Sequence, residues 1–162
     1  MALTRLNNQA LPTGSVLQVQ SFERTTYFEQ PTQGSMIDCG VSVNITPISS
    51  SNKILVLVSG VLGNDTAGNT ALIHLLRDST KIAVGTSSST TDYNASAFSL
   101  GSAVYEAGHF GINHLDSPAT TNQITYKLQI GAFNGDAFIG SRGDNPAAQS
   151  VPTNITVMEI AG

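Results

Sequence analysis

Alternation between apolar and polar residues is the clearest signal in this chain. Residues 124–130 read Ile-Thr-Tyr-Lys-Leu-Gln-Ile, so every second side chain is apolar. In residues 37–45 every second residue, from Ile37 to Ile45, is again apolar. A period of two is the pattern of a β-strand with one buried and one solvated face. Both segments are therefore predicted to be half-buried strands.

Shorter segments predict the remaining strands. We expect them at residues 16–22, 25–28, 53–58, 71–77, 81–84, 97–100, 103–115, 137–139 and 154–160. Residues 53–58 are apolar on both faces, which indicates a central strand between layers. Gly108 and Gly111 interrupt the segment 103–115. Asn134-Gly135 is a strong hairpin signal, with residues 137–139 as the return strand.

The whole pattern predicts an all-β chain, since no segment shows helical periodicity over three turns. Eight to ten short antiparallel strands favour a single jelly-roll-like β-sandwich. Residues 1–14 are polar apart from Leu3, Leu6 and Leu11. We expect these residues to form an extended N-terminal arm that docks on another protein, and residues 15–162 to form the sandwich.

Composition narrows the class of protein. Only 11% of the 162 residues are charged, against about 25% in an average soluble protein. The surface must therefore be polar mainly through hydroxyls and amides, as in extracellular β proteins and virion proteins. The formal net charge is −4 and the seven basic residues are scattered singly. That distribution argues against a nucleic-acid partner, because phosphate binding needs clustered Lys and Arg.

The compartment follows from similar reasoning. Cys39 is the single cysteine and lies in an apolar alternation, so it is interpreted as a buried small hydrophobe. The N-terminus has no apolar signal-peptide region. The longest apolar run, residues 54–62, is too short to span a membrane, so no membrane partner is expected. A secreted-type surface without an export signal fits a virion component that is made in the host cytoplasm and released by lysis.

Candidate chemistry is sparse, and neither enzymatic activity nor a cofactor is expected. His109 and His114 are five residues apart, so on one strand they face opposite sides and cannot share a metal ion. The acidic residues are isolated, so no carboxylate pair for hydrolysis stands out. Arg142-Gly143-Asp144 is an integrin-type tripeptide, and it is interpreted as an ordinary glycine turn with solvated charges.

Two polar loops, one around Asp92-Tyr93-Asn94 and one around Arg142-Gly143-Asp144, are candidates for contact with a host. Binding residues concentrate on loops held by a rigid scaffold, and the loops of a sandwich cluster at its ends. Tyr93 could stack on a sugar ring. Asp92, Asn94 and Arg142 could form hydrogen bonds with the hydroxyls of the sugar. The alternative is that both loops only solvate the tip or pack on neighbouring subunits.

Five segments in register resemble those of virion structural proteins of tailed phages, marine ones especially. They are "LPTGSVLQVQ", "CGVSVNITPISSSNKILVLVSGVLG", "LLRDSTKI", "HLDSPATTNQITYKLQI" and "ITVMEIAG". The resemblance implies a non-enzymatic virion surface protein, of the kind described as tail fibre or structural protein and commonly homotrimeric. The motifs form strands, so no functional residues carry over. The chain is short and lacks a shaft, which favours a decoration or cement accessory on the capsid or tail.

Two functions remain open at this stage. One is a homotrimeric accessory that attaches to a capsid or tail platform through Leu3, Leu6 and Leu11. The trimer is expected because low charge and strands that are apolar on both faces leave surface to cover. The other is the receptor-binding knob of a tail fibre that recognises host surface glycans. Copy number would separate them, since a decoration protein is present in many more copies per virion.

Overall fold

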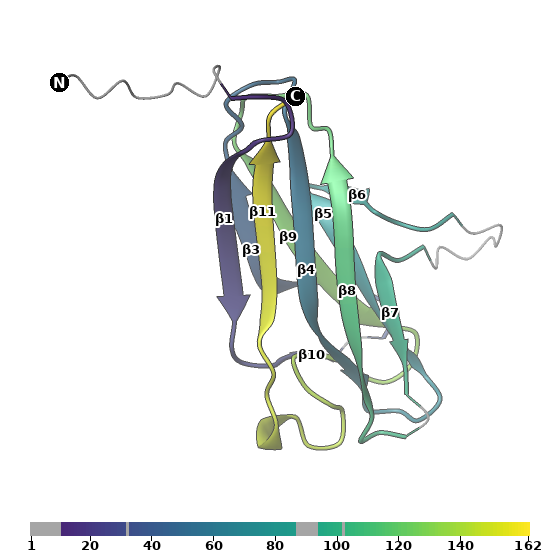
Figure 1. Ribbon diagram of the computed structural model, residues 1–162. Coiled ribbons are helices and arrows are strands. Elements are labelled where there is room, and N and C mark those ends of the chain that lie inside the picture. Colours follow the sequence, from purple (N-terminus) through teal and green to yellow (C-terminus); the bar gives the residue numbers. More distant parts are fainter. Residues whose placement is uncertain (1–10, 32, 87–93, 102) are drawn as a thin grey trace.

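The structure is a computed structural model that describes residues 11–31, 33–86, 94–101 and 103–162 (Figure 1). All strand pairings recorded in this part of the chain are antiparallel. Its elements, in chain order, are β1 (Val16–Arg24), β2 (Phe28–Gln30), β3 (Ile37–Ile45), β4 (Lys53–Asn64), β5 (Thr70–Arg77), β6 (Thr80–Ile82), β7 (Ala97–Leu100), β8 (Ala107–Asp116), β9 (Ile124–Ala132), β10 (Ala137–Ile139), the 3₁₀ helix η2 (Pro146–Ala148) and β11 (Thr153–Ile160).

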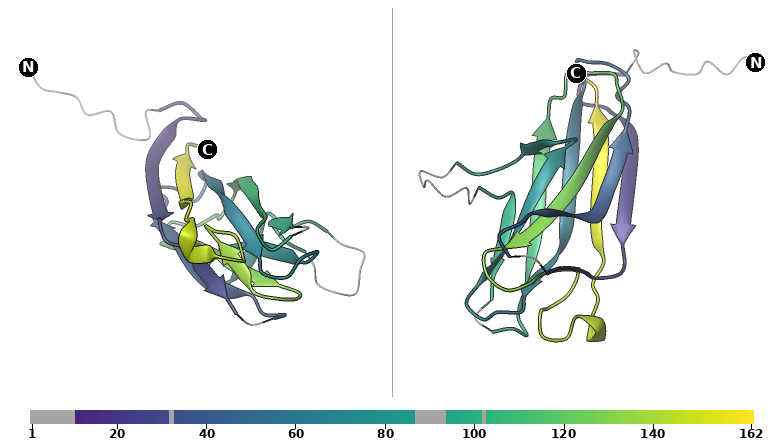
Figure 2. Two further views of the ribbon diagram at one scale, coloured as in Figure 1. Left: turned by 90° about the horizontal axis from the view of Figure 1, so that it is seen from below. Right: turned by 180° about the vertical axis from the view of Figure 1, so that it is seen from behind.

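The strands form two sheets packed face to face (Figures 1 and 2). In what we call the first sheet the main strands run in the order β1-β11-β4-β8, with β2 and β10 as short additions. In the second sheet the order is β3-β9-β5-β7, with β6 beside β5. Along the chain the main strands pass between the sheets in the way that builds a jelly roll. The prediction of an all-β, jelly-roll-like sandwich is confirmed.

The core lies between the inward faces of the two sheets. The alternation expected in residues 37–45 and 124–130 is present, since every second residue is buried in β3 from Cys39 onward and in β9. β4 and β11 supply the facing layer from the first sheet. The largest of the fully buried apolar side chains are Tyr126, Ile45, Ile54, Leu62, Ile73, Leu75, Ile124, Leu128, Ile130, Ile139 and Ile155.

β4 is longer than the sequence indicated, and it is not covered on both sides. It continues to Asn64 because β8 pairs with it as far as Gly63 and β10 pairs with its last residues. Gly63 permits this, since a Cβ there would lie 2.7 Å from the Ser141 carbonyl oxygen. Leu55 and Leu57 point outward and are only partly buried. The expectation of a strand sandwiched between layers is wrong for this outer face.

β8 is continuous from Ala107 to Asp116, so the expected interruption at Gly108 and Gly111 is wrong. The glycines serve close packing rather than a break. A Cβ at Gly108 would collide with the Ser99 side chain of β7, in the other sheet. The glycine therefore lets the two sheets approach each other at this edge.

The predicted hairpin at Asn134-Gly135 is also wrong, although β10 spans the expected residues. β10 pairs with β2 and β4 rather than with β9, so the chain changes sheets at this turn. Gly135 has a φ of 72°. The Asp136 amide donates to the Asp65 carboxylate at 2.7 Å, which holds the turn against the loop after β4.

Two short strands begin at residues other than those expected. β2 starts at Phe28 rather than Thr25, because the Arg24 guanidinium binds the carbonyl oxygens of Thr26 and Tyr27 and turns the chain there. β6 ends at Ile82 rather than Val84, and Ala83 after it has a φ of 54°. Across the described residues, no helix is long and apolar enough to cross a membrane.

Candidate functional site

The root of the N-terminal arm is fastened to the end of the sandwich. The Gly14 amide donates to the Ala161 carbonyl at 2.9 Å, and the Ala161 amide donates to the Ser15 carbonyl at 2.9 Å. Gly14 has a φ of 90°, which glycine adopts without strain. Leu3 and Leu6 lie outside the described residues. Of the three predicted attachment residues, Leu11 is the one whose surroundings can be described.

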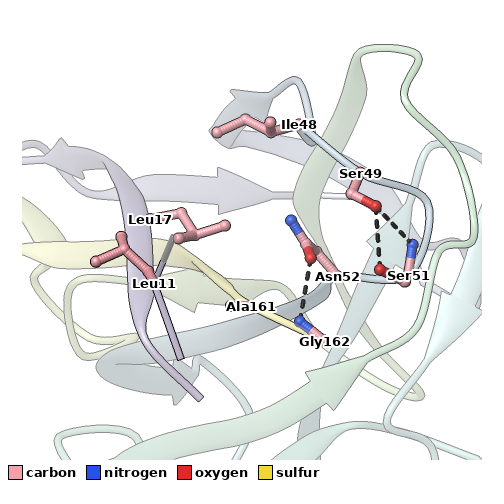
Figure 3. Close-up of a pocket in the computed structure, with 8 residues that line it drawn as sticks. All are labelled: Leu11, Leu17, Ile48, Ser49, Ser51, Asn52, Ala161 and Gly162. Carbon is pink, nitrogen blue, oxygen red and sulfur yellow. Dashed lines mark hydrogen bonds between the residues drawn. The ribbon is translucent and has the colours of Figure 1, made fainter. Parts of the chain in front are cut away.

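Leu11 lines a pocket of about 250 Å³ at this end, which we call the arm-end pocket (Figure 3). Leu11 and Leu17 form an apolar wall on one side of it, and Ile48 lies on the other side. Across from them lies the turn between β3 and β4, where the Ser51 amide donates to the Ser49 hydroxyl. An apolar wall facing a polar turn suits an extended peptide that offers one aliphatic side chain and backbone hydrogen bonds.

A buried carboxylate holds the arm end together. Glu159 is 0% exposed. Its oxygens accept hydrogen bonds from the Ile48 amide at 2.7 Å, the Asn52 side chain at 2.6 Å and the Gln18 side chain at 2.5 Å. The Asn52 side chain in turn accepts from the Gly162 amide at 3.1 Å. Because buried charge is costly without such donors, this network rigidly joins β1, the β3–β4 turn and β11.

A second polar cluster joins the two sheets at the same end. Asp116, at the end of β8, receives Nη1 of Arg77 at 2.9 Å from both carboxylate oxygens, and the Tyr126 hydroxyl donates to it at 2.7 Å. Burial and the hydrogen bond to Asp116 raise the pKa of Tyr126. We call these three residues the inter-sheet clamp.

Sequence reasoning missed both polar clusters. The sequence suggested isolated acidic residues and singly scattered basic ones, whereas Asp116 and Arg77 pair in the structure. A usable signal was the parity of the strands: Asp116 continues the inward positions of β8, and Glu159 occupies an inward position of β11 between Val157 and the chain end. A charged residue at an inward position predicts a buried partner.

Of the four predicted glycan contacts, the structure describes Asn94 and Arg142, and these two lie in different parts of the molecule. Asp92 and Tyr93 lie outside the described residues. Asn94 is half-buried at the base of its loop, close to Ser96, whose amide donates to the Ile73 carbonyl in the middle of β5. The described stems of this loop leave the side of the sandwich, whereas the connection that carries Arg142 lies at the end opposite the arm (Figure 1). The described parts of the two loops thus start from different places, and a shared contact with Asp92 and Tyr93 stays a prediction.

Arg142 lies in a pocket of about 220 Å³, which it lines with Tyr105, Gln149 and Val151 among others. Its Nε lies 2.9 Å from the Asp144 carboxylate, so the two charges of the Arg-Gly-Asp tripeptide pair with each other. Gly143 is buried against the backbone of Asn64 and Asp65, where a Cβ would not fit. The interpretation of the tripeptide as a turn therefore holds, except that its charges are paired.

The outer face of the first sheet carries a partly exposed aliphatic row. The register places Val19 of β1, Met158 of β11, Leu55 of β4 and Leu115 of β8 side by side across the sheet. Val19 and Leu115 are each 50% exposed, and the two central residues are partly buried. We call these four residues the aliphatic row. Toward the other end of β4, Val61 is buried beside the segment that contains Gln149 and Val151.

The outer face of the second sheet is polar along β3 and β9. Asp38 accepts hydrogen bonds from Lys127 at 2.7 Å and from Gln129 at 2.8 Å. The hydrogen bond from Lys127 is the main reason why the pKa of Asp38 is lowered. Phe98 and Leu100 on β7 are 68% and 62% exposed and make a second apolar spot at the edge of this sheet.

The remaining chemistry of the described residues is limited. Cys39 is fully buried, as expected, and burial raises the pKa of its thiol to about 11. A thiol with so high a pKa is a poor nucleophile at neutral pH. Within the described ranges, no group of three or more His, Cys, Asp or Glu residues could hold a metal ion.

Comparison with known proteins gives little guidance. No family model matches the chain, and no curated protein matches it. The solved structures that are similar include a mutant VP2 protein of infectious bursal disease virus in derived T=1 particles, with 16% identity and a TM-score of 0.48 over 99% of this chain and 41% of that one. The structure of the Gx strain of the same virus has 15% identity and a TM-score of 0.48, over 100% of this chain and 42% of that one. The chain spans about two fifths of these proteins, and likeness at this level bears on neither its function nor its assembly.

Proposed function

We propose that this chain is a non-enzymatic bacteriophage virion surface protein. It is a homotrimeric β-sandwich accessory of the capsid or tail, assembled in the host cytoplasm and clamped to the particle through its N-terminal arm. The sequence resemblance to phage virion proteins supports this proposal. So does the jelly roll, an architecture that capsid and lectin domains commonly use.

One structural observation carries the proposal. The five segments that resemble phage virion proteins meet at the arm end, although they are far apart in sequence. They supply all six side chains of the two buried polar clusters: Gln18, Asn52, Arg77, Asp116, Tyr126 and Glu159. They also supply the residues that line the arm-end pocket. The five segments therefore build one rigid platform, and the arm starts from it.

The attachment role is tested by truncation. Deleting residues 2–10 removes Leu3 and Leu6 but keeps Leu11 and the hydrogen bonds of the arm root. The truncated protein is expected to fold and to stay trimeric, yet to be absent from purified particles. A matched control is the double substitution Asn7→Ala and Asn8→Ala, which alters the arm and spares its leucines. Normal incorporation of the truncated protein, measured by gel densitometry, would refute attachment through the arm.

A second candidate function is a receptor-binding tail fibre knob that recognises host surface glycans. The pocket around Arg142 favours it, because Tyr105 at its rim is 63% exposed. An exposed ring next to Arg and Gln side chains is able to stack on a sugar and bond its hydroxyls. Asp92, Tyr93 and Asn94 remain proposed contacts in a separate loop. Tyr105→Ala with Arg142→Ala should then abolish phage adsorption, and unchanged adsorption by particles that carry the variant would eliminate this role for the pocket.

A further inference from the structure

The outer face of the first sheet offers copies of this chain a surface without net formal charge. The outward positions of β1, β11, β4 and β8 include one lysine, Lys53, and one glutamate, Glu23. These two lie toward opposite ends of the face, and the aliphatic row lies between their levels. Although the whole chain carries a net charge of −4, two copies would not repel each other across this face.

The width of this sheet matches what a closed three-fold assembly requires. Four strands spaced about 4.8 Å apart make a face roughly 19 Å wide, and three such faces form a triangle whose centre lies about 5.5 Å from each face. That distance is close to half of the roughly 10 Å at which packed sheets interdigitate. Three copies that turn this face inward would therefore fill the space around the axis with side chains and leave no channel.

The residues fall in suitable places in such a prism. Met158 and Leu55 lie on the two central strands and would point at the axis. Val19 and Leu115 lie on the outer strands, β1 and β8, and would meet at each corner between neighbouring copies. Eight residues of about 3.3 Å along each strand give the face roughly 500 Å² in projection. Because protruding side chains make the accessible surface larger than its projection, the area buried approaches the roughly 800 Å² that each partner buries in a stable complex.

The geometry points to a trimer in which the aliphatic row of each copy faces a three-fold axis parallel to the strands, with Val19 of one copy against Leu115 of the next. This inference rests on the trimer of the proposed function and specifies its interface. The occupant of the face is a second copy rather than the particle, because the arm at the end of the sandwich is assigned to attachment. The polar outer face of the second sheet, bonded to itself through Asp38, is left to solvent.

The first test is the oligomeric state of charge variants in sedimentation. We expect the wild-type protein to be a trimer at micromolar concentration. Val19→Glu and Leu115→Glu should each raise the dissociation concentration at least about tenfold, since every copy would then bring an unpaired carboxylate into the contact. Ser42→Glu is the matched control, because it adds the same charge to an exposed strand position on the opposite face. Circular dichroism confirms that each variant keeps its strands.

The second test is a cross-link that depends on the arrangement of the copies. In a Val19→Cys, Leu115→Cys double variant, the two thiols of one copy are three strand spacings apart, about 14 Å, and cannot form a disulfide within it. Oxidation should yield a covalent trimer on a non-reducing gel, and Cys39 is too buried to interfere. The pair Ser42→Cys with Leu115→Cys should yield none.

The outcomes separate this inference from the proposal on which it rests. A wild-type trimer that survives both glutamate substitutions and does not cross-link would overturn the inference and leave the trimer intact. A trimer that Phe98→Glu disperses, while Val19→Glu does not, would overturn it too and place the contact at the edge of the second sheet. A wild-type protein that stays monomeric would refute the trimer, and the inference with it.

Discussion

The two sheets of this sandwich are similar on the inside and different on the outside. Their inward faces are both lined with Val, Ile and Leu. On the outer face of the second sheet, Asp38 binds Lys127 and Gln129, and the Thr125 hydroxyl donates to Asn44 at 2.7 Å. On the outer face of the first sheet, the corresponding central positions are the aliphatic row. Within the described residues, the outer face along β3 and β9 is polar and bonded to itself, whereas the outer face of the first sheet carries exposed aliphatic side chains.

This difference shows where the few charged residues of the chain are placed. Cross-strand polar pairs let a sheet face water without aggregating, and the second sheet uses them. An exposed apolar patch on a protein surface often marks a contact surface, and the aliphatic row is such a patch. Under the proposed trimer, the second sheet faces solvent and the first faces partner copies. The predictions that follow test it, beginning with the interactions that keep the sheets together.

The largest effect is expected from the inter-sheet clamp, which holds two such different faces on one core. Asp116→Ala leaves Arg77 and the Tyr126 hydroxyl without their shared partner. The free energy of unfolding should fall by about 3–5 kcal/mol, the usual cost of removing one partner from a buried pair. Tyr126→Phe removes a single hydrogen bond and should cost only about 0.5–1.5 kcal/mol. Equal losses for the two variants in urea denaturation would show that Arg77 adds nothing to the clamp.

The second effect concerns the arm end, where β1 and β11 meet the turn between β3 and β4. Glu159→Gln replaces one carboxylate oxygen, which accepts hydrogen bonds, with an amide NH₂ group that cannot accept them and would face the surrounding donors. We expect a loss of about 1–3 kcal/mol in unfolding free energy, because a buried donor is left unsatisfied. Glu23→Gln, on an exposed position of β1 in the same sheet, is the control and should be nearly neutral. A neutral Glu159→Gln would mean that the network does not stabilise the arm end.

The fold could be predicted from the sequence wherever one face of a strand is buried and the other is wet. β3 and β9 were placed correctly for this reason, since the alternation states which side chains point inward. β10 was assigned the right residues and the wrong neighbour, because a turn signal such as Asn134-Gly135 says that the chain reverses but not which sheet receives it. The turn is held by a hydrogen bond from the Asp136 amide to Asp65, a residue far away in sequence.

The candidate site was less predictable than the fold, for a related reason. Leu11 was identified because aliphatic residues are conspicuous in a polar arm. The networks around Glu159 and Asp116 depend on donors from segments that are distant in sequence, and local patterns carry no record of such pairings. The contrast between the outer faces was also hidden. Residues 54–58 are apolar on both sides, and the sequence does not distinguish a covering layer from a second copy.

A third prediction uses concentration to compare the faces. If the aliphatic row joins three copies, the melting temperature of the wild-type protein should rise with its concentration, because dissociation accompanies unfolding. With an unfolding entropy of about 2.1 cal/mol/K per residue, the rise should be roughly 3 °C per tenfold increase. Val19→Glu should remove this dependence and Ser42→Glu should keep it. Calorimetry at two concentrations measures both, and a wild-type melting temperature independent of concentration would contradict the trimer.

The smallest effect is expected on the polar face, and its pH dependence gives it a sign. Lys127 and Gln129 hold the pKa of Asp38 below its usual value of 3.8. A carboxyl with a lowered folded-state pKa contributes stability that is present above its unfolded value and is lost as pH falls through the folded one. Since the Asp38 side chain is 51% exposed, solvent screening limits the contribution to about 0–1 kcal/mol. Asp38→Asn should thus cost that little at pH 7 and progressively less as the pH falls below 3.8, and should leave the oligomeric state unchanged. If Asp38→Asn dispersed the trimer as Val19→Glu should, both outer faces would take part in assembly, and the contrast between them would not hold.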